Sequence, residues 1–75
     1  MSDRQQNWFA RARAEWIAEM LAIYGYINRE HLVRKFGISV PQASLDLRRF
    51  ADAHPHEIAY DPVVKRYVAM NGVGQ

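Results

Sequence analysis

The residues that most constrain the fold lie between two helical patterns that are separated by only a three-residue turn, Gly37 to Ser39. Gly37 follows the last apolar residue of the first pattern and is typical of a helix C-terminus. Ser39 is a good N-cap, and Gln42 three residues later completes a capping box. Pro41 falls in the first helical turn, where its missing N–H has no intrahelical partner. Two helices joined so closely predict a helix-turn-helix unit.

The apolar spacing predicts three helices in all. The first is expected over residues 3–24, ended by Gly25, and the second over residues 29–36, capped by Asn28. The third runs over residues 39–53, where the following "HPHE" breaks it. The apolar stripe expected on the first helix is Phe9, Ala12, Trp16, Met20 and Ile23, widened by Ile17, Leu21 and Tyr24.

Beyond the third helix the period changes from helical to alternating. Residues 58–69 predict a β-hairpin around "DPVV", because Asp-Pro starts turns. On its second arm the pattern leaves open whether Tyr67 with Ala69 or Val68 with Met70 points inward. A hairpin directly after a helix-turn-helix unit is typical of a wing.

The expected fold class is therefore mainly α (α+β): a winged helix-turn-helix with three helices followed by a β-hairpin wing. A single domain is expected over residues 3–70, with residues 71–75 as a flexible C-terminal tail. Ile27, isolated between the first two helices, is expected to form a one-pair strand. The chain has 75 residues and no cysteine, so tight helical packing or a partner subunit is expected to replace disulfides.

The third helix has an outward face suited to the DNA major groove. At ~100° per residue, Ala43, Leu47 and Phe50 form its buried stripe. On the opposite side, short polar residues near the helix start can reach base edges, and arginines further along can meet phosphates or guanine. Leu45, about 160° from the stripe, could pack on a thymine methyl. The residues of this helix expected on DNA are Ser39, Val40, Pro41, Gln42, Ser44, Leu45, Arg48 and Arg49.

The remaining basic residues fall in two clusters that this fold would bring toward the same DNA. Arg34 and Lys35 end the second helix, which crosses the backbone in such folds. Lys65 and Arg66 lie in the wing and would reach the flanking backbone or minor groove. The net charge of +2 is too small to indicate nucleic acid by itself, so the distribution of charge carries the inference.

Two alternatives compete with DNA binding. Arginine pairs are usually a solvated face, and Asp46 with Arg49 reads as an ordinary i,i+3 pair. In a protein-interaction module, Leu45 and Trp8 would be interface anchors and the arginines a polar rim.

Chemistry of other kinds has less support in the sequence. His54 and His56 could suggest a metal site with His31, but two histidines exposed in a loop fit better. The sequence has no Ser/His/Asp set, paired carboxylates or Gly-rich phosphate loop, so no enzyme activity, metal or cofactor is expected. No window of about 18 apolar residues and no secretory signal is found, so a cytoplasmic location and no membrane contact are expected.

The segments "INRE", "FGIS-x-x-QAS-x-DL" and "YD-x-x-x-K-x-YVA" together resemble the N-terminal winged helix of bacterial WYL-domain transcription regulators, and more distantly DeoR-type winged helices. The resemblance covers about Trp8 to Met70. It implies sequence-specific binding of double-stranded operator DNA as a dimer, usually for repression, and association with the nucleoid when bound.

The same resemblance implies roles for individual residues. Ser39, Gln42 and Ser44 would meet bases, while Arg48 and Lys65 would contact the backbone. Leu45 departs from the pattern, because that position is often basic. A small-molecule effector is expected only if a downstream WYL-like domain exists. Dimerisation is expected through the first helix, at Trp8, Arg11 and Arg13.

Overall fold

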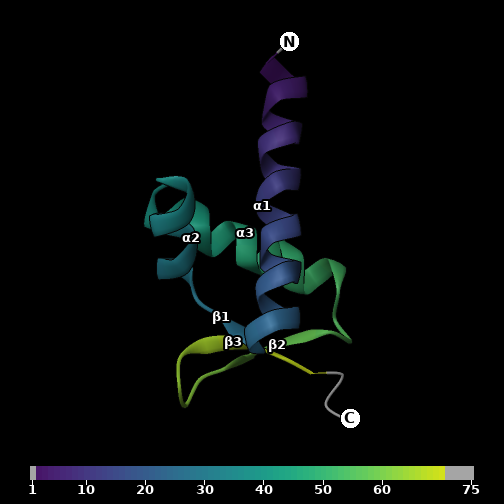
Figure 1. The fold of residues 1–75 in the computed structure, drawn as a ribbon, viewed down its shortest axis with the longest axis vertical. Coiled ribbons are helices and arrows are strands. Elements are labelled where there is room, and N and C mark those ends of the chain that lie inside the picture. Colours follow the sequence, from purple (N-terminus) through teal and green to yellow (C-terminus); the bar gives the residue numbers. More distant parts are fainter. Residues whose placement is uncertain (1, 71–75) are drawn as a thin grey trace.

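The computed structural model describes residues 2–70, and the predicted tail at residues 71–75 lies outside them. The order of elements is the predicted one (Figure 1), which confirms the winged helix-turn-helix fold class. The helices and strands are α1 (Ser2–Tyr24), β1 (Tyr26–Ile27), α2 (Arg29–Phe36), α3 (Val40–Ala53), β2 (Ile58–Asp61) and β3 (Arg66–Ala69).

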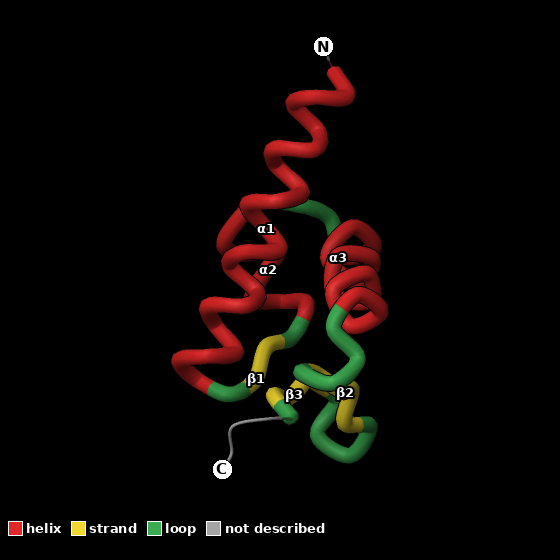
Figure 2. Tube along the Cα trace, turned by 90° about the vertical axis from the view of Figure 1, so that its right-hand side faces the viewer, coloured by secondary structure: helices red, strands yellow, loops and turns green. Residues whose placement is uncertain are grey.

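The three strands form an antiparallel sheet in the order β1-β3-β2, at the end of the molecule opposite the N-terminus of α1 (Figures 1 and 2). Tyr67 pairs with Tyr60 of β2 and with Ile27 of β1, so the predicted strand at Ile27 is confirmed. Ile58 pairs with Ala69 and is buried. Tyr67 and Ala69 pack against the core, so of the two inward-facing pairs that the sequence left open, Tyr67 with Ala69 is the one that points inward.

Local hydrogen bonds fix the ends of the helix-turn-helix unit. Asn28 accepts from the backbone N–H of His31, and Nδ1 of His31 accepts from the backbone N–H of Asn28. Gly37 takes a left-handed conformation with φ of 66°, which a glycine adopts without strain, and its N–H donates to the carbonyl of Val33. At the start of α3, Oγ of Ser39 accepts from the N–H of Gln42. The Gln42 amide turns to another partner, so the predicted capping box forms only by half.

One core joins all six elements, with β3 contributing the partly buried Tyr67 and Ala69. Its buried members are Ile17, Leu21, Ile27, Leu32, Ala43, Leu47, Phe50 and Ile58. The buried stripe predicted for α3 is confirmed by this set.

The stripe predicted for α1 is wrong at both ends. Phe9 is 53% exposed and Ile23 is 60% exposed, whereas Ile17 and Leu21 are buried. The first turns of α1 project beyond the other elements (Figures 1 and 2), and Phe9 lines a surface groove with Phe36 and Ile38 rather than the core. No helix in the described part of the chain is long and apolar enough to cross a membrane.

An ion pair ties α1 to α3 inside the domain. Nε of Arg13 lies 2.5 Å from Oδ2 of Asp46, and the Gln42 amide donates to Oδ1 at 3.0 Å. The Asp46 side chain is 7% exposed and that of Arg13 is 14% exposed. The surface pair predicted between Asp46 and Arg49 is therefore wrong. One turn of helix from Arg49, Asp46 faces α1 rather than solvent.

Candidate nucleic-acid interface

The outer face of α3 carries a mixed set of side chains. Pro41 and Arg48 are exposed, as the sequence predicted, while Leu45 is only half-buried rather than fully outward. Val40 in the first turn is 45% exposed and is the more accessible apolar residue. Asp52, four residues after Arg48, is also exposed. The Asp52 carboxylate was not among the side chains predicted for this face, although its i,i+4 spacing from Arg48 places both side chains on the same face of α3.

The flanks of this face point to different neighbours. Gln42 and Arg49 line a groove against α1, together with Trp8 and Phe36. Ser44 lines a cleft on the other side, between α3, the start of α2 and the hairpin. The DNA-binding residues predicted on α3 are thus divided between an α1 side, an outward face and a wing side.

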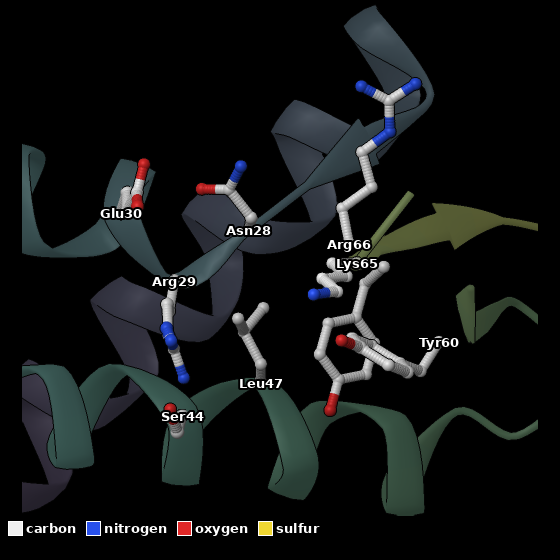
Figure 3. A pocket seen from close by; sticks show the side chains of 9 residues that line it. Asn28, Arg29, Glu30, Ser44, Leu47, Tyr60, Lys65 and Arg66 are labelled. Atoms are coloured by element: carbon white, nitrogen blue, oxygen red, sulfur yellow. The ribbon is translucent and has the colours of Figure 1, made fainter. Parts of the chain in front are cut away.

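The cleft on the wing side has a volume of about 430 Å³. It is lined by Asn28, Arg29 and Glu30 at the start of α2, Ser44 and Leu47 on α3, and Tyr60, Lys65, Arg66 and Tyr67 of the hairpin. In Figure 3, Arg29 extends toward Ser44, and the Lys65 ammonium and Tyr60 hydroxyl enter from the opposite wall. We name this the α2–wing cleft.

Arg29 and Tyr60 were not among the residues predicted to bind DNA. Arg29 was predicted only as the first residue of the second helix, and Tyr60 only as a residue of the hairpin. The available signal was the position of Arg29 at the first turn of α2, where a helix approaches the DNA backbone in this fold.

The turn of the wing holds Lys65 in place. Its backbone lies in the left-handed region with φ of 59°, and its N–H donates to the carbonyl of Asp61 at 2.7 Å. Oδ1 of Asp61 also accepts from the N–H of Val63 at 2.9 Å. These bonds close the turn so that Lys65 is presented at the mouth of the α2–wing cleft, whereas Arg66 turns away.

Three predicted basic contacts do not direct their charge into this cleft. Arg66 lines the cleft, but its guanidinium stacks over the ring of Tyr26, 4.0 Å from the ring centroid, and points away from Ser44 and Lys65 (Figure 3). Lys35 lies 5.9 Å from the ring centroid of Trp16 on α1. Arg34 and Lys35 are exposed in the last turn of α2, at the opposite end of that helix from Arg29.

Two tyrosines and an arginine interact electrostatically where α3 meets the hairpin. Burial raises the pKa of the Tyr67 hydroxyl, and the neighbouring Tyr60 raises it further. The Arg48 guanidinium lowers that pKa and Asp52 raises it, with burial the largest influence. Arg48 is exposed on α3, one helical turn beyond Ser44 of the α2–wing cleft, and its positive charge favours the ionised form of Tyr67.

The histidines that could have suggested a metal have other contacts. Nδ1 of His31 is bound at the N-cap of α2. His54 stacks on Phe50 with ring centroids 4.3 Å apart, and its Nδ1 lies 3.6 Å from Glu57. Within the described residues, no three His, Cys, Asp or Glu side chains are grouped as metal ligands.

A helix-turn-helix unit followed directly by an antiparallel hairpin, with basic side chains on the recognition helix and in the wing turn, defines a winged helix-turn-helix domain of the kind found in transcription regulators. The chain belongs to the family of BrxR transcriptional regulator winged helix-turn-helix domains, whose family model matches residues 10–72. This match confirms the resemblance inferred from the motifs.

Relatives of known name agree with this family. The DNA-binding transcriptional repressor CapW of Escherichia coli (strain KTE188) is 46% identical over 55 residues, which are 73% of this chain and 18% of the relative. A protein of the same name from Pseudomonas aeruginosa is 42% identical over 63 residues, 84% of this chain and 21% of the relative. The chain spans about a fifth of the length of these curated relatives.

Proposed function

We propose that this chain binds double-stranded DNA sequence-specifically, as the DNA-reading domain of a transcriptional repressor. The observation that carries the proposal is that two exposed cations, Arg29 of α2 and Lys65 of the wing, line one cleft with Ser44 of α3, while Arg48 is exposed one helical turn beyond Ser44. The CapW relatives, which are DNA-binding transcriptional repressors, support it. Residues 3–70 act as one unit in this proposal.

In the proposed complex, the N-terminal half of α3 enters the major groove. Val40 and Pro41 are exposed in the first turn of α3, where side chains reach base edges in this class of domain. Arg48 then meets a phosphate or a guanine. Asp52 repels phosphates, so we expect α3 to contact DNA only from its N-terminus to Arg48. The hairpin over residues 58–69 lies on the flanking backbone or minor groove.

Fluorescence anisotropy with a labelled duplex from the region upstream of its own gene tests this proposal. Binding is expected to weaken with salt, with a slope of about −0.9 in log K against log salt for each phosphate contacted. Arg48→Ala is expected to weaken binding about 5- to 150-fold. Arg49→Ala removes the same charge from the same helix on the α1 side and is expected to weaken it less. An affinity that changes neither with salt concentration nor on Arg48→Ala substitution would contradict the proposed DNA binding.

The proposed repressor acts as a homodimer that pairs through the projecting end of α1. Trp8 is 63% exposed and stacks edge-on against Phe9, with ring centroids 5.0 Å apart. Arg11 is exposed beside them, but Arg13 is engaged with Asp46 and is dropped from the dimer surface. Sedimentation of Trp8→Ala is expected to give monomer, with Ile23→Ala, exposed at the other end of α1, as control. A dimer that survives Trp8→Ala contradicts this pairing.

One of the two interface anchors expected in a protein-interaction module argues against that alternative function. Leu45 is half-buried, so it offers less apolar surface to a partner than the sequence suggested. Trp8 remains available, but it is the residue that the dimer would use. DNA binding is therefore the function that the geometry supports best.

A further inference from the structure

We propose that the α2–wing cleft clamps one backbone phosphate of the bound DNA, with Arg29 and Lys65 supplying the charge. The inference rests on the proposed function and extends it to one defined contact. It also gives Ser44 and Tyr60 a role as phosphate donors, where sequence reasoning had placed Ser44 on a base and Tyr60 nowhere on DNA.

The polar groups that converge in the cleft are of the type that an anion needs. Arg29 and Lys65 carry only donors, and the hydroxyls of Ser44 and Tyr60 can donate to a phosphate oxygen. Arg29 reaches in from α2 while Lys65 and Tyr60 reach in from the hairpin (Figure 3). Among the residues that the structure describes, Arg29 and Lys65 form no ion pair. Their donors are thus available to a ligand.

The charges around the cleft also favour a phosphate. Glu30 lies at the rim and its carboxylate points away from Ser44 and Lys65 (Figure 3), so two positive charges face the interior without an acid between them. A tyrosine hydroxyl is neutral at physiological pH, and burial raises the pKa of Tyr67 further, so Tyr67 adds no negative charge to the hairpin wall. Leu47 lines the cleft from α3 and adds no charge to it.

The two cations are positioned before any ligand arrives. Asn28 caps α2 immediately before Arg29, and the hydrogen bond from Lys65 to Asp61 fixes the wing turn. Arg29 and Lys65 therefore start from anchored backbone, which lowers the ordering cost of binding. A volume of about 430 Å³ accommodates one phosphodiester with part of its sugar, rather than a whole base pair.

Replacement of single phosphates of the duplex by uncharged methylphosphonates tests the clamp. In wild-type protein one position is expected to lose about tenfold or more in affinity, as for a charge-assisted hydrogen bond. At that position the replacement is expected to cost Arg29→Ala and Lys65→Ala clearly less than it costs wild type, because one of the two cations that contact the phosphate is already absent. Each variant is also expected to lower the salt slope by about one. Tyr60→Phe, which removes only a hydroxyl, should show a smaller coupling to the same position.

Arg49→Ala serves as the matched control, since it removes an arginine that lies on the α1 side of α3. In this variant the methylphosphonate is expected to cost as much as in wild type. If Arg29→Ala and each methylphosphonate lower the affinity for DNA independently, so that the combined fold-loss is the product of the separate ones, the clamp is refuted while DNA binding stands. A cleft that binds a free phosphorylated ligand instead of the DNA backbone would give this same result. If wild-type protein does not bind the duplex at all, the proposed function itself fails.

Discussion

Removal of the Arg13 side chain is expected to destabilise the domain more than any other change at a charged residue between α1 and α3. Asp46 accepts two hydrogen bonds from Arg13 and one from Gln42, at a site where its side chain is 7% exposed. Arg13→Ala leaves that carboxylate with a single donor. Breaking a buried pair in this way costs about 3–5 kcal/mol, and less where water can enter the vacated space.

The Arg13 side chain is 14% exposed, so water reaches part of the site and we expect a loss of about 2–4 kcal/mol. A chain of 75 residues has a free energy of unfolding of about 4–11 kcal/mol, at ~0.05–0.15 kcal/mol per residue. The loss is therefore a large fraction of the total. Replacement of both partners, Arg13→Met with Asp46→Leu, is expected to be nearly neutral, because neither charge remains to be desolvated.

Urea unfolding followed by tryptophan fluorescence measures this difference. Trp16 packs edge-on against Phe36, with ring centroids 5.6 Å apart, and reports the separation of α1 from α2. With an m value of about 1 kcal/mol/M, Arg13→Ala should lower the urea midpoint by about 2 M or more. A loss below about 0.5 kcal/mol would mean that the pair behaves as a solvated surface contact. A double variant as unstable as Arg13→Ala would refute the role of the unpaired carboxylate.

Three further changes have outcomes set by single features of the structure. Leu47→Ala should cost about 2–5 kcal/mol in urea unfolding because Leu47 is 1% exposed, and half-buried Leu45→Ala should cost clearly less; equal costs would contradict the assigned core. Gly37→Ala should cost about 1–2 kcal/mol in thermal unfolding, since alanine is strained at φ of 66°, and an unchanged midpoint would argue against the left-handed cap. The raised pKa of Tyr67 contributes stability that is present below the ordinary tyrosine pKa and is lost as pH rises through the folded value, so Tyr67→Phe should flatten the alkaline loss of stability.

The basic residues predicted to contact DNA differ in their own contacts within the domain. Lys65 lines the α2–wing cleft and forms no ion pair among the described residues, whereas Arg66 is stacked on Tyr26 and Lys35 lies beside Trp16. A cation already held by an aromatic ring must give up that contact to reach a phosphate. We therefore expect alanine variants of Arg66 to affect binding less than those of Lys65.

The sequence by itself determined the order of the elements and the ends of the helices. These features depend on residues close together in the chain: Asn28 and Ser39 cap helices through N–H groups three residues away, and Gly37 ends one through its own backbone. The buried stripe of α3 was equally predictable, because helical periodicity places Ala43 and Leu47 on one side. Local geometry suffices for all of these.

Only the tertiary structure decided how these elements face one another. Asp46 could pair locally with Arg49 or with a residue of another helix, and it bonds to Arg13, 33 positions away. Periodicity defines an apolar stripe on α1 but not how much of the helix is covered, so Phe9 was placed in the core although it is exposed. Arg29 and Lys65, 36 positions apart in the sequence, line one cleft because the hairpin folds back beside the start of α2. Such pairings follow from packing of distant segments, which no local pattern specifies.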